Sequence, residues 1–377
     1  MNRVKFGDIV KDVKVNVDRM NNPYEYYVAG DHMDSEDLTI HRKGRFATDD
    51  VGPAFVRIFK PGQILYGSRR TYLKKVAVAD FSGICANTTF VFESKDHSIF
   101  DQRLLPFIML SDSFTSWSIS KSKGSTNPYV LFSDLADYEF DLPPLEEQKV
   151  LADKLWAAYR LKEGYKKLLC VTDEMVKSQF IEMFSSYQTT PVGNYIEDSY
   201  PGEWGTEDKD GNGVKVVRTT NFTNSGKLDL TDVVTRSISE KKIERKTIRK
   251  YDTILERSGG TTDNPVGRVV LFEEDEQYLC NNFTQVLRFK KVNPIFAFYS
   301  LFYFYHTNKI VVRSMGSKTT GIQNLNMSKY LEIGIPNASD DEQKKFVAIA
   351  KQADKSKFEL RKSIDAIDKV IKSLINN

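Results

Sequence analysis

The chain of 377 residues is 40% hydrophobic and 28% charged, with a formal net charge of +3. Its length predicts two or three domains, each large enough to bury a core, and its composition is that of an ordinary globular protein. The mild positive charge is compatible with nucleic-acid binding but does not imply it, so only local clusters of charge can support that function.

Cysteine usage and hydrophobicity exclude two further classes of protein. The three cysteines are an odd number at no metal-ligand spacing, which argues against a disulfide framework and for a reducing compartment: Cys85, Cys170 and Cys280. The N-terminal segment lacks the apolar region of a signal peptide, and the most apolar stretch, Pro294 to Tyr305, is too short to span a bilayer. We therefore expect a cytoplasmic protein that has no membrane partner.

The predicted elements occur twice along the chain in a similar order. In the first part, β-branched and aromatic runs predict strands at Val56–Phe59, Ile64–Tyr66, Lys75–Val78 and Thr89–Glu93, then a helix at Phe100–Ser113 and a long helix over 144–184. After a link at Ser185–Pro191, the second part has strands at Val214–Arg218, Gly267–Phe272 and Thr284–Phe289, a helix at Pro294–Asn308 and a long helix over 339–377. The predicted fold class is α+β, with mixed globular units at 1–143 and 187–336.

Short motifs repeat in the same order in both parts. Pairs 195 residues apart include the five residues from Cys85 and from Cys280, and Glu147-Gln148-Lys149 with Glu342-Gln343-Lys344. Three more pairs lie between or before these: Gln63–Arg70 with Asp252–Gly260, Lys123-Gly124-Ser125 with Met315-Gly316-Ser317, and Leu142-Pro143 with Ile335-Pro336. Because chance matches would not preserve this order, the chain is an internal duplication.

Each long helix carries a heptad seam of mostly apolar residues. In the second helix the seam consists of Phe346, Ala350, Ala353, Lys357, Leu360, Ile364, Ile367, Ile371 and Leu374. The same register in the first helix gives Leu151, Leu155, Ala158, Lys162, Tyr165, Leu169, Thr172, Val176 and Gln179. Each helix is roughly 55 Å long at 1.5 Å per residue. We expect the two helices to pack as an antiparallel pair that places the globular units at opposite ends.

The sequence contains no catalytic constellation that we would defend. A P-loop motif is absent, and Asn127-Pro128-Tyr129 lacks the second proline of a DNA amino-methyltransferase loop. The Glu93-Ser94-Lys95 tripeptide resembles a nuclease motif that is common by chance. The four histidines are scattered and suggest neither a metal site nor a triad: His32, His41, His97 and His306. We expect no catalytic residue, no metal and no cofactor on this chain.

A calcium-loop reading of Asp208–Gly213 is also weak, because Thr219 stands where an EF-hand needs glutamate. A hairpin turn built on Asn212-Gly213 is the favoured interpretation.

Basic and hydroxyl-rich loops recur in both copies and predict contacts with DNA. Lysine and arginine neutralise phosphates, hydroxyl groups and glycine N–H groups approach the same oxygens, and Arg or Asn can read base edges. The candidate residues in the first copy are Arg69, Arg70, Lys74, Lys75, Lys121, Lys123, Ser125 and Asn127. Those in the second copy are Arg218, Thr219, Thr220, Asn221, Arg257, Ser258, Thr261, Thr262, Lys318, Thr319 and Thr320. The densest positive run, Arg236–Lys250, fits either a DNA contact or a solvated helix.

The stretch Leu142-Pro143-Pro144-Leu145-Glu146-Glu147-Gln148-Lys149, which opens a long helix after an aromatic-rich unit, resembles the specificity subunit of type I restriction–modification enzymes. This resemblance covers essentially the whole chain. It implies target recognition domains at 1–143 and 187–336 and spacer helices at 144–184 and 339–377, with each domain reading half of a split double-stranded DNA target. It also implies two methyltransferase subunits, which carry S-adenosylmethionine and usually methylate adenine, and restriction (translocase–nuclease) subunits as partners.

One junction departs from the motif that carries this resemblance. The second copy has Asn337-Ala338-Ser339 in place of Pro144-Leu145, so its helix start is rebuilt, with Ser339 as N-cap and Glu342 completing a capping box. Equal contacts of both junctions with the methyltransferase are therefore in doubt. Three alternatives stay open: the recognition subunit of a split methyltransferase–nuclease or a methylation-only system, a free-standing DNA-binding protein, and a coiled-coil adaptor that does not touch DNA.

Overall fold

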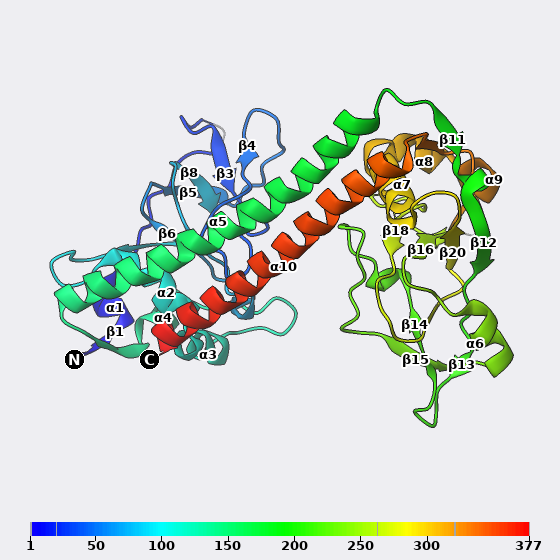
Figure 1. Ribbon diagram of the computed structural model, residues 1–377. Helices are drawn as coiled ribbons and strands as arrows, with labels where there is room; N and C mark the ends of the chain where they lie inside the picture. Colours follow the sequence, from blue (N-terminus) through cyan, green and yellow to red (C-terminus); the bar gives the residue numbers. More distant parts are fainter. Residues whose placement is uncertain (1, 20, 262, 320–321, 377) are drawn as a thin grey trace. The chain divides into compact units, whose positions relative to one another are not determined.

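The computed structural model describes residues 2–19, 21–261, 263–319 and 322–376. The chain forms two compact units, and each unit joins one copy of the repeat to one part of each long helix (Figure 1). Unit 1 consists of residues 1–168 and 359–377, and unit 2 consists of residues 169–358. Helices and strands are mixed in both units, so the fold class is α+β, as predicted.

Two four-stranded sheets form the scaffold of unit 1. The antiparallel sheet has the order β2 (Val10–Asp12), β9 (Thr89–Ser94), β6 (Ile64–Gly67), β7 (Val76–Val78). The second sheet has the order β4 (Gly44–Arg45), β3 (Tyr26–Val28), β8 (Gly83–Ala86), β5 (Phe55–Phe59), and its β3–β8 pair is parallel. A separate antiparallel pair joins β1 (Asn2–Lys5) to β10 (Glu139–Leu142). The four strands predicted for this copy are present, each within one residue of its predicted ends.

The helices of unit 1 correct one prediction. They are α1 (Phe6–Ile9), α2 (Leu105–Leu110), α3 (Asp112–Ser120) and α4 (Phe132–Ala136), with short 3-10 helices η1 (Thr71–Leu73) and η2 (Gln102–Leu104). The single helix predicted at Phe100–Ser113 is wrong. Ser111 has an extended backbone, and its hydroxyl accepts the N–H of Phe114 as the N-cap of α3, so the chain ends one helix and starts another.

Unit 2 contains two corresponding sheets. One has the order β12 (Ile196–Pro201), β20 (Thr284–Phe289), β16 (Thr253–Glu256), β18 (Val269–Leu271). The other has the order β13 (Thr206–Glu207), β15 (Val234–Ser237), β14 (Val214–Val217), β19 (Tyr278–Cys280). Cys85 lies opposite Val28 in one parallel pair, and Cys280 lies opposite Val217 in the other. The duplication seen in the sequence is therefore a duplication of structure.

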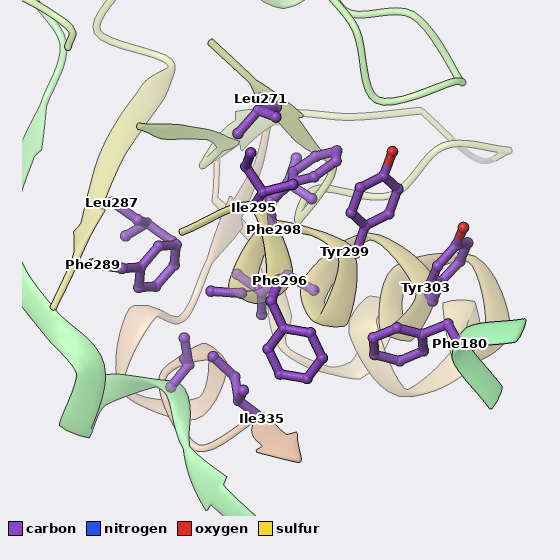
Figure 2. Packing of buried hydrophobic residues seen from close by; sticks show 14 of the residues in the cluster. Phe180, Leu271, Leu287, Phe289, Ile295, Phe296, Phe298, Tyr299, Tyr303 and Ile335 are labelled. Carbon is purple, nitrogen blue, oxygen red and sulfur yellow. The ribbon is translucent and has the colours of Figure 1, made fainter. Parts of the chain in front are cut away.

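The remaining elements of unit 2 complete its core. Strand β11 (Thr189–Pro191) pairs with β23 (Gly334–Pro336), and a three-stranded sheet consists of β17 (Ser258–Gly259), β22 (Ile322–Leu325) and β21 (Gly316–Thr319). The 3-10 helices are η3 (Val192–Tyr195) and η4 (Thr219–Asn221). The α-helices are α6 (Glu240–Lys246), α7 (Pro294–Thr307), α8 (Lys309–Ser314) and α9 (Met327–Tyr330). Figure 2 shows α7 at the centre of this core, where the ring of Phe180 lies 5.8 Å from Phe296 and 5.2 Å from Tyr303.

The long helices α5 (Leu145–Phe184) and α10 (Asp340–Asn376) agree with their predicted ranges within one residue. Every predicted seam residue is at least partly buried. In unit 1 the first part of α5 and the last part of α10 share a core, which includes Leu155 and Ile371. In unit 2 the other ends meet, with the rings of Phe180 and Phe346 5.1 Å apart. The two helices therefore run antiparallel.

Two ion pairs cross this seam. Lys162 Nζ lies 2.5 Å from Asp368 in unit 1, and Lys357 Nζ lies 2.6 Å from Asp173 in unit 2. Both lysines are seam residues, and the lysines and the aspartates are each 195 residues apart. One ion pair is therefore the image of the other under the internal repeat. A polar pair inside a mostly apolar seam specifies the register of the two helices, because any shift would separate each buried ammonium from the facing carboxylate. Lys357 has a second partner on its own helix, Asp354 at 2.9 Å, so the dependence on the facing carboxylate is strongest at Lys162.

The start of α10 is built as its sequence indicates. The predicted capping box of α10 is confirmed: Ser339 N–H donates to the carboxylate of Glu342 at 2.9 Å, and the Glu342 N–H donates back to the Ser339 hydroxyl at 3.4 Å.

The Lys162 pair yields a test of the seam. Asp368→Asn leaves a largely buried ammonium without its carboxylate, so we expect the free energy of unfolding to fall by about 3 kcal/mol. Adding Lys162→Met removes that ammonium, so we expect the free energy of unfolding of the double variant to return to within about 1 kcal/mol of the wild-type value. Glu359→Gln on the same helix, which breaks an exposed pair with Lys362, changes stability by less than about 0.5 kcal/mol. Urea unfolding measures all three, and equal losses from Asp368→Asn and Glu359→Gln would contradict the role assigned to the seam pair.

Candidate nucleic-acid interface

The two basic loops predicted in the first copy lie side by side. After β6, Ser68 accepts the N–H of Val130 at 3.0 Å, and the Arg70 N–H donates to Pro128 O at 2.7 Å. Lys123 and Tyr129 exchange both backbone hydrogen bonds, at 2.8 and 2.9 Å. These segments (residues 68–70, 123 and 128–130) form a small three-stranded arrangement, the loop ribbon of unit 1. Strand β6 is buried in the sheet, so the ribbon stands on a rigid base.

Two arginine side chains of this ribbon point to solvent. Arg69 and Arg70 are exposed, and their guanidinium groups have no partner among the described residues. Arg70 has a positive φ of 51°, a conformation that branched and bulky residues rarely adopt. Lys121 lies 4.6 Å from the ring of Trp117, and Lys123 Nζ lies 2.9 Å from Asp134. Ser125 and Asn127 are exposed at the tip of the loop.

The other two predicted lysines of this copy have partners within the unit. Lys74 lies 3.0 Å from Glu36 and 3.6 Å from Asp112, and its side chain is only 17% exposed. Lys75 donates to the carbonyl of Gly30. Both side chains hold the base of the loop rather than extending from it.

The second copy builds the same arrangement from β17, β22 and β21, the loop ribbon of unit 2. Leu325 N–H donates to Arg257 O at 2.8 Å, as Val130 does to Ser68, and the Ser258 hydroxyl donates to Asn324 Oδ1 at 2.7 Å. The ladder places Ser317 opposite Asn324, whereas Lys123 lies opposite Tyr129. The Gly-Ser match made from the sequence is therefore displaced by two residues: Ser317 corresponds to Lys123, and Gly124 lies nearer the loop tip.

Several predicted residues of the second copy support the backbone. Asn221 is buried, and its amide donates to the carbonyls of Asp229 and Asp232. Arg218 pairs with Asp232 at 3.0 Å. Ser258 is also buried. Polar residues in turns commonly serve the local backbone in this way.

The other predicted residues of the second copy are exposed or partly buried, lie on β21, or lie outside the described residues. Thr220 and Thr261 are exposed, while Arg257 and Thr219 are partly buried. Lys318 and Thr319 lie on β21, and Thr262 and Thr320 lie outside the described residues.

The dense basic run Arg236–Lys250 contains a solvated helix, α6, one of the two alternatives. No residue of α6 is buried, and Lys242 and Lys246 both pair with Glu203, at 3.2 and 3.1 Å. Arg236 stacks 4.4 Å from the ring of Trp204. Residues 208–213 join β13 to β14, where an EF-hand would have a helix, so the structure gives no support to a calcium loop. The predicted hairpin turn on Asn212-Gly213 is wrong, because β13 and β14 do not pair with each other and both pair with β15, which lies between them.

Sequence reasoning missed Tyr129, which the ribbon of unit 1 places between Arg69 and Lys123. Its side chain is 40% exposed, so an aromatic face stands beside two cations. The Asn127-Pro128-Tyr129 motif drew attention to this tyrosine, but the motif was compared only with the catalytic loop of a DNA amino-methyltransferase.

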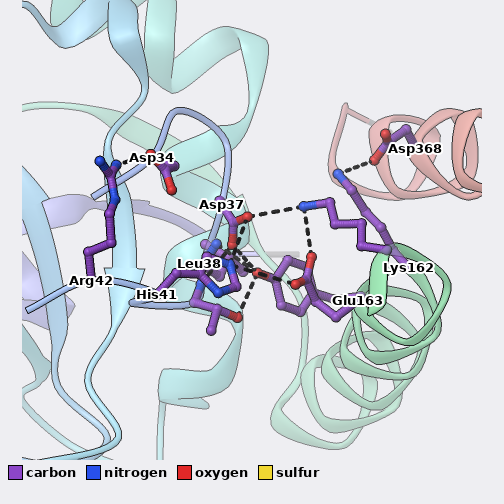
Figure 3. Close-up of polar contacts among 11 residues, drawn as sticks. Asp34, Asp37, Leu38, His41, Arg42, Lys162, Glu163 and Asp368 are labelled. Carbon is purple, nitrogen blue, oxygen red and sulfur yellow. Dashed lines mark hydrogen bonds and ion pairs between the residues drawn. The ribbon is translucent and has the colours of Figure 1, made fainter. Parts of the chain in front are cut away.

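Among the described residues, one cluster has the residue types of a metal site: Asp37, His41 and Glu163 (Figure 3). The ammonium of Lys166 already lies 3.0 Å from Asp37 and 2.8 Å from Glu163, where a cation would bind. Burial raises the pKa of Asp37, but hydrogen bonds from Tyr159, Thr39 N–H and Lys166 outweigh burial and lower it to about 2. The cluster therefore fastens the loop at Asp37 to α5 by an internal ion pair.

Residues 16–169 and 199–368 each match the type I restriction modification DNA specificity domain. The chain belongs to this family. A 90-residue segment is 34% identical to the EcoDI specificity subunit of Escherichia coli, and it covers 24% of this chain but only 19% of that protein.

Two solved structures share the fold of the whole chain. One is the type I restriction-modification S subunit from M. genitalium (TM-score 0.58, 14% identity, 99% of this chain and 94% of that one). The other comes from a study of complex assembly and conformational transition of the type I R-M system (TM-score 0.56, 18% identity, 99% and 96%). In the described part of the chain, no helix is both long enough and apolar enough to cross a membrane.

The duplicated Glu-Gln-Lys motif fixes each specificity domain to its long helix. Gln148 is buried, donates to Pro143 O at 2.8 Å, and accepts the Asp101 N–H at 2.9 Å. Gln343 is bonded in the same way, to Ala338 O and the Asn293 N–H, both at 2.9 Å. The glutamine of the motif that carried the family resemblance therefore has a structural role, because it joins the start of the long helix to the backbone of the domain.

Removing the charges of Arg69 and Arg70 tests the loop ribbon of the first specificity domain. Arg69→Gln with Arg70→Asn eliminates both, and asparagine tolerates the positive φ of Arg70, so the fold is retained. We expect weaker DNA binding and a plot of log affinity against log salt that is less steep by about 0.9 for each phosphate that is no longer neutralised. Arg3→Gln, which removes an exposed charge on β1 outside the ribbon, serves as the control. Unchanged affinity of the double variant at fixed salt would show that this is the wrong loop.

Proposed function

We propose that this chain is the sequence-specific DNA-recognition subunit of a type I restriction–modification system, and that it reads a split target with one specificity domain for each half. The recurrence of the loop ribbon carries the proposal. In both units it follows the same sheet strand, β6 or β16, and uses corresponding backbone hydrogen bonds. A chain with one binding surface would not need the same structure twice.

The chemistry of the ribbons suits DNA. Arg69 and Arg70 present exposed guanidinium groups that have no partner among the described residues. Guanidinium groups in general pair with phosphates or bind the O6 and N7 atoms of guanine in the major groove. Exposed hydroxyl and amide groups, including Ser125, Asn127 and Thr261, add short-range hydrogen bonds. Two ribbons of different residue content imply an asymmetric target.

Catalysis in this proposal belongs to partner subunits. Methyltransferase subunits would supply S-adenosylmethionine and the methyl transfer, and restriction subunits would supply translocation and cutting. Membership of the specificity-domain family and the fold shared with type I S subunits support this division. A free-standing DNA-binding protein would use the same ribbons, so stable association with a methyltransferase separates the two possibilities.

Lengthening the helix pair tests the split-target proposal. One heptad is inserted in α5 between Lys162 and Asp173 and another in α10 between Lys357 and Asp368, so that both seam ion pairs remain intact. The added length of about 10 Å corresponds to about three base pairs of DNA at 3.4 Å each. We expect the two recognised half-sites to stay the same and the gap between them to grow by about three base pairs.

The readout is the DNA motif methylated by the complex in cells. A control variant carries the same seven residues in the link between α5 and β11, where they do not lengthen the helices, and its gap is expected to be that of the wild type. A lengthened pair that methylates the original motif would contradict the proposal.

A further inference from the structure

A tight turn shapes the loop ribbon of unit 2. Gly259 and Gly260 have φ values of 110° and 64°, which glycine adopts readily and other residues do not. A side chain on Gly260 would bring its Cβ within 2.8 Å of Val266 N. Such a turn has many alternative conformations in solution, so its shape depends on what holds it.

A buried carboxylate holds this turn. Glu256 is the last residue of β16 and is only 2% exposed. One of its oxygens accepts the Arg268 Nε–H at 2.6 Å, and the other accepts the Gly260 N–H at 3.3 Å. The charged pair is short and largely shielded from water, which makes it among the stronger hydrogen bonds available to a protein.

The other partner, Arg268, reaches the second predicted DNA loop of this unit. Its Nη2 donates to Thr219 O at 3.4 Å, and its guanidinium lies 5.7 Å from the centre of the Phe222 ring. Thr219 belongs to η4, which carries the candidates Thr219, Thr220 and Asn221. A single ion pair therefore connects the turn at Gly260 to η4.

Unit 1 has no such device at the corresponding place. Glu256 lies opposite Thr284 in its sheet, and the residue opposite Thr89 in unit 1 is Gly67. There the loop is shaped by the positive φ of Arg70 and by the ion pairs of Lys74.

We propose that Glu256 and Arg268 are positioning residues on which discrimination between bases by the second specificity domain depends. The first specificity domain does not depend on them. They hold the turn at Gly260 and the η4 segment in one fixed arrangement against the DNA. This inference rests on the proposed function. Without the pair, the same side chains would remain but would sample several arrangements, so discrimination between bases in one half-site would fall while the other half-site was read as before.

The experiment selects DNA from a pool of random double-stranded oligonucleotides with the full chain bound to its methyltransferase. Glu256→Gln places an amide nitrogen against one of two donors, Arg268 or the Gly260 N–H, and breaks the link. Well-read positions discriminate roughly tenfold to a hundredfold between base pairs. We expect this preference to fall about tenfold or more at positions of one half-site only. Arg268→Lys keeps the positive charge but is too short to bond both Glu256 and Thr219, so the same half-site weakens.

The matched control is Asp252→Asn. Asp252 and Arg288 form a comparably shielded ion pair at 2.6 Å, next to the other end of β16 and away from the turn. Its loss is expected to lower thermal stability and leave both half-site motifs intact. If Glu256→Gln does not fold, Arg268→Lys replaces it in the test, and the expected result is again a weaker base preference in one half-site only. Retention of both motifs at wild-type strength, or equal loss of one motif in Asp252→Asn, would overturn the inference. A wild-type complex that selects no split motif would instead refute the proposed function.

Discussion

The pairing of Lys162 with Asp368 and of Lys357 with Asp173 is the constraint on which the rest of the structure depends. Each pair places a largely buried ammonium in a mostly apolar helix seam, where a carboxylate of the facing helix neutralises it. Lys357 also pairs with Asp354 on its own helix. The two pairs are related by the 195-residue repeat, so they set one antiparallel register from both ends. Each unit then takes part of both helices into its own core. Unit 1 includes residues 359–377 from the far end of the chain, whereas unit 2 is the continuous stretch 169–358.

Duplication explains what the two specificity domains share, and local chemistry explains how they differ. Both carry a parallel strand pair with a buried cysteine, a glutamine that secures the long helix, and a three-stranded loop ribbon after one sheet strand. Arg70, in a left-handed conformation, shapes the first ribbon. The second has a glycine turn that depends on the carboxylate of Glu256. The two loop ribbons therefore share their backbone arrangement but are held by different interactions. This combination suits the proposed DNA target, whose two halves differ in sequence.

The sequence allowed the long-range plan to be predicted better than the loops. The heptad seam was predicted residue by residue, because a seven-residue apolar repeat sustained over a helix of this length has one structural meaning. Strands were found within one or two residues, but the helix at Phe100–Ser113 was split by a serine cap that resembles any other serine in sequence. Membership of the family agrees with the resemblance seen in the Pro-Pro-Leu-Glu-Glu-Gln stretch.

Loop residues were harder to predict, because their partners come from distant segments or from the backbone of the same turn. Lys74 pairs with Glu36, and the buried amide of Asn221 donates to the carbonyls of Asp229 and Asp232. Neither partner can be read from the residues next to it in the sequence. The DNA contacts of all the candidate loops remain predictions.

We propose that this one duplicated chain reads a split DNA target on behalf of partner enzymes. Mapping methylated bases across the host genome, with and without the gene for this chain, tests that claim most directly. We expect a methylated motif of two short, different half-sites separated by a fixed gap of unread base pairs, and we expect this motif to disappear when the gene is removed. A methylation pattern that is unchanged by the removal, or a continuous motif without a gap, would contradict it.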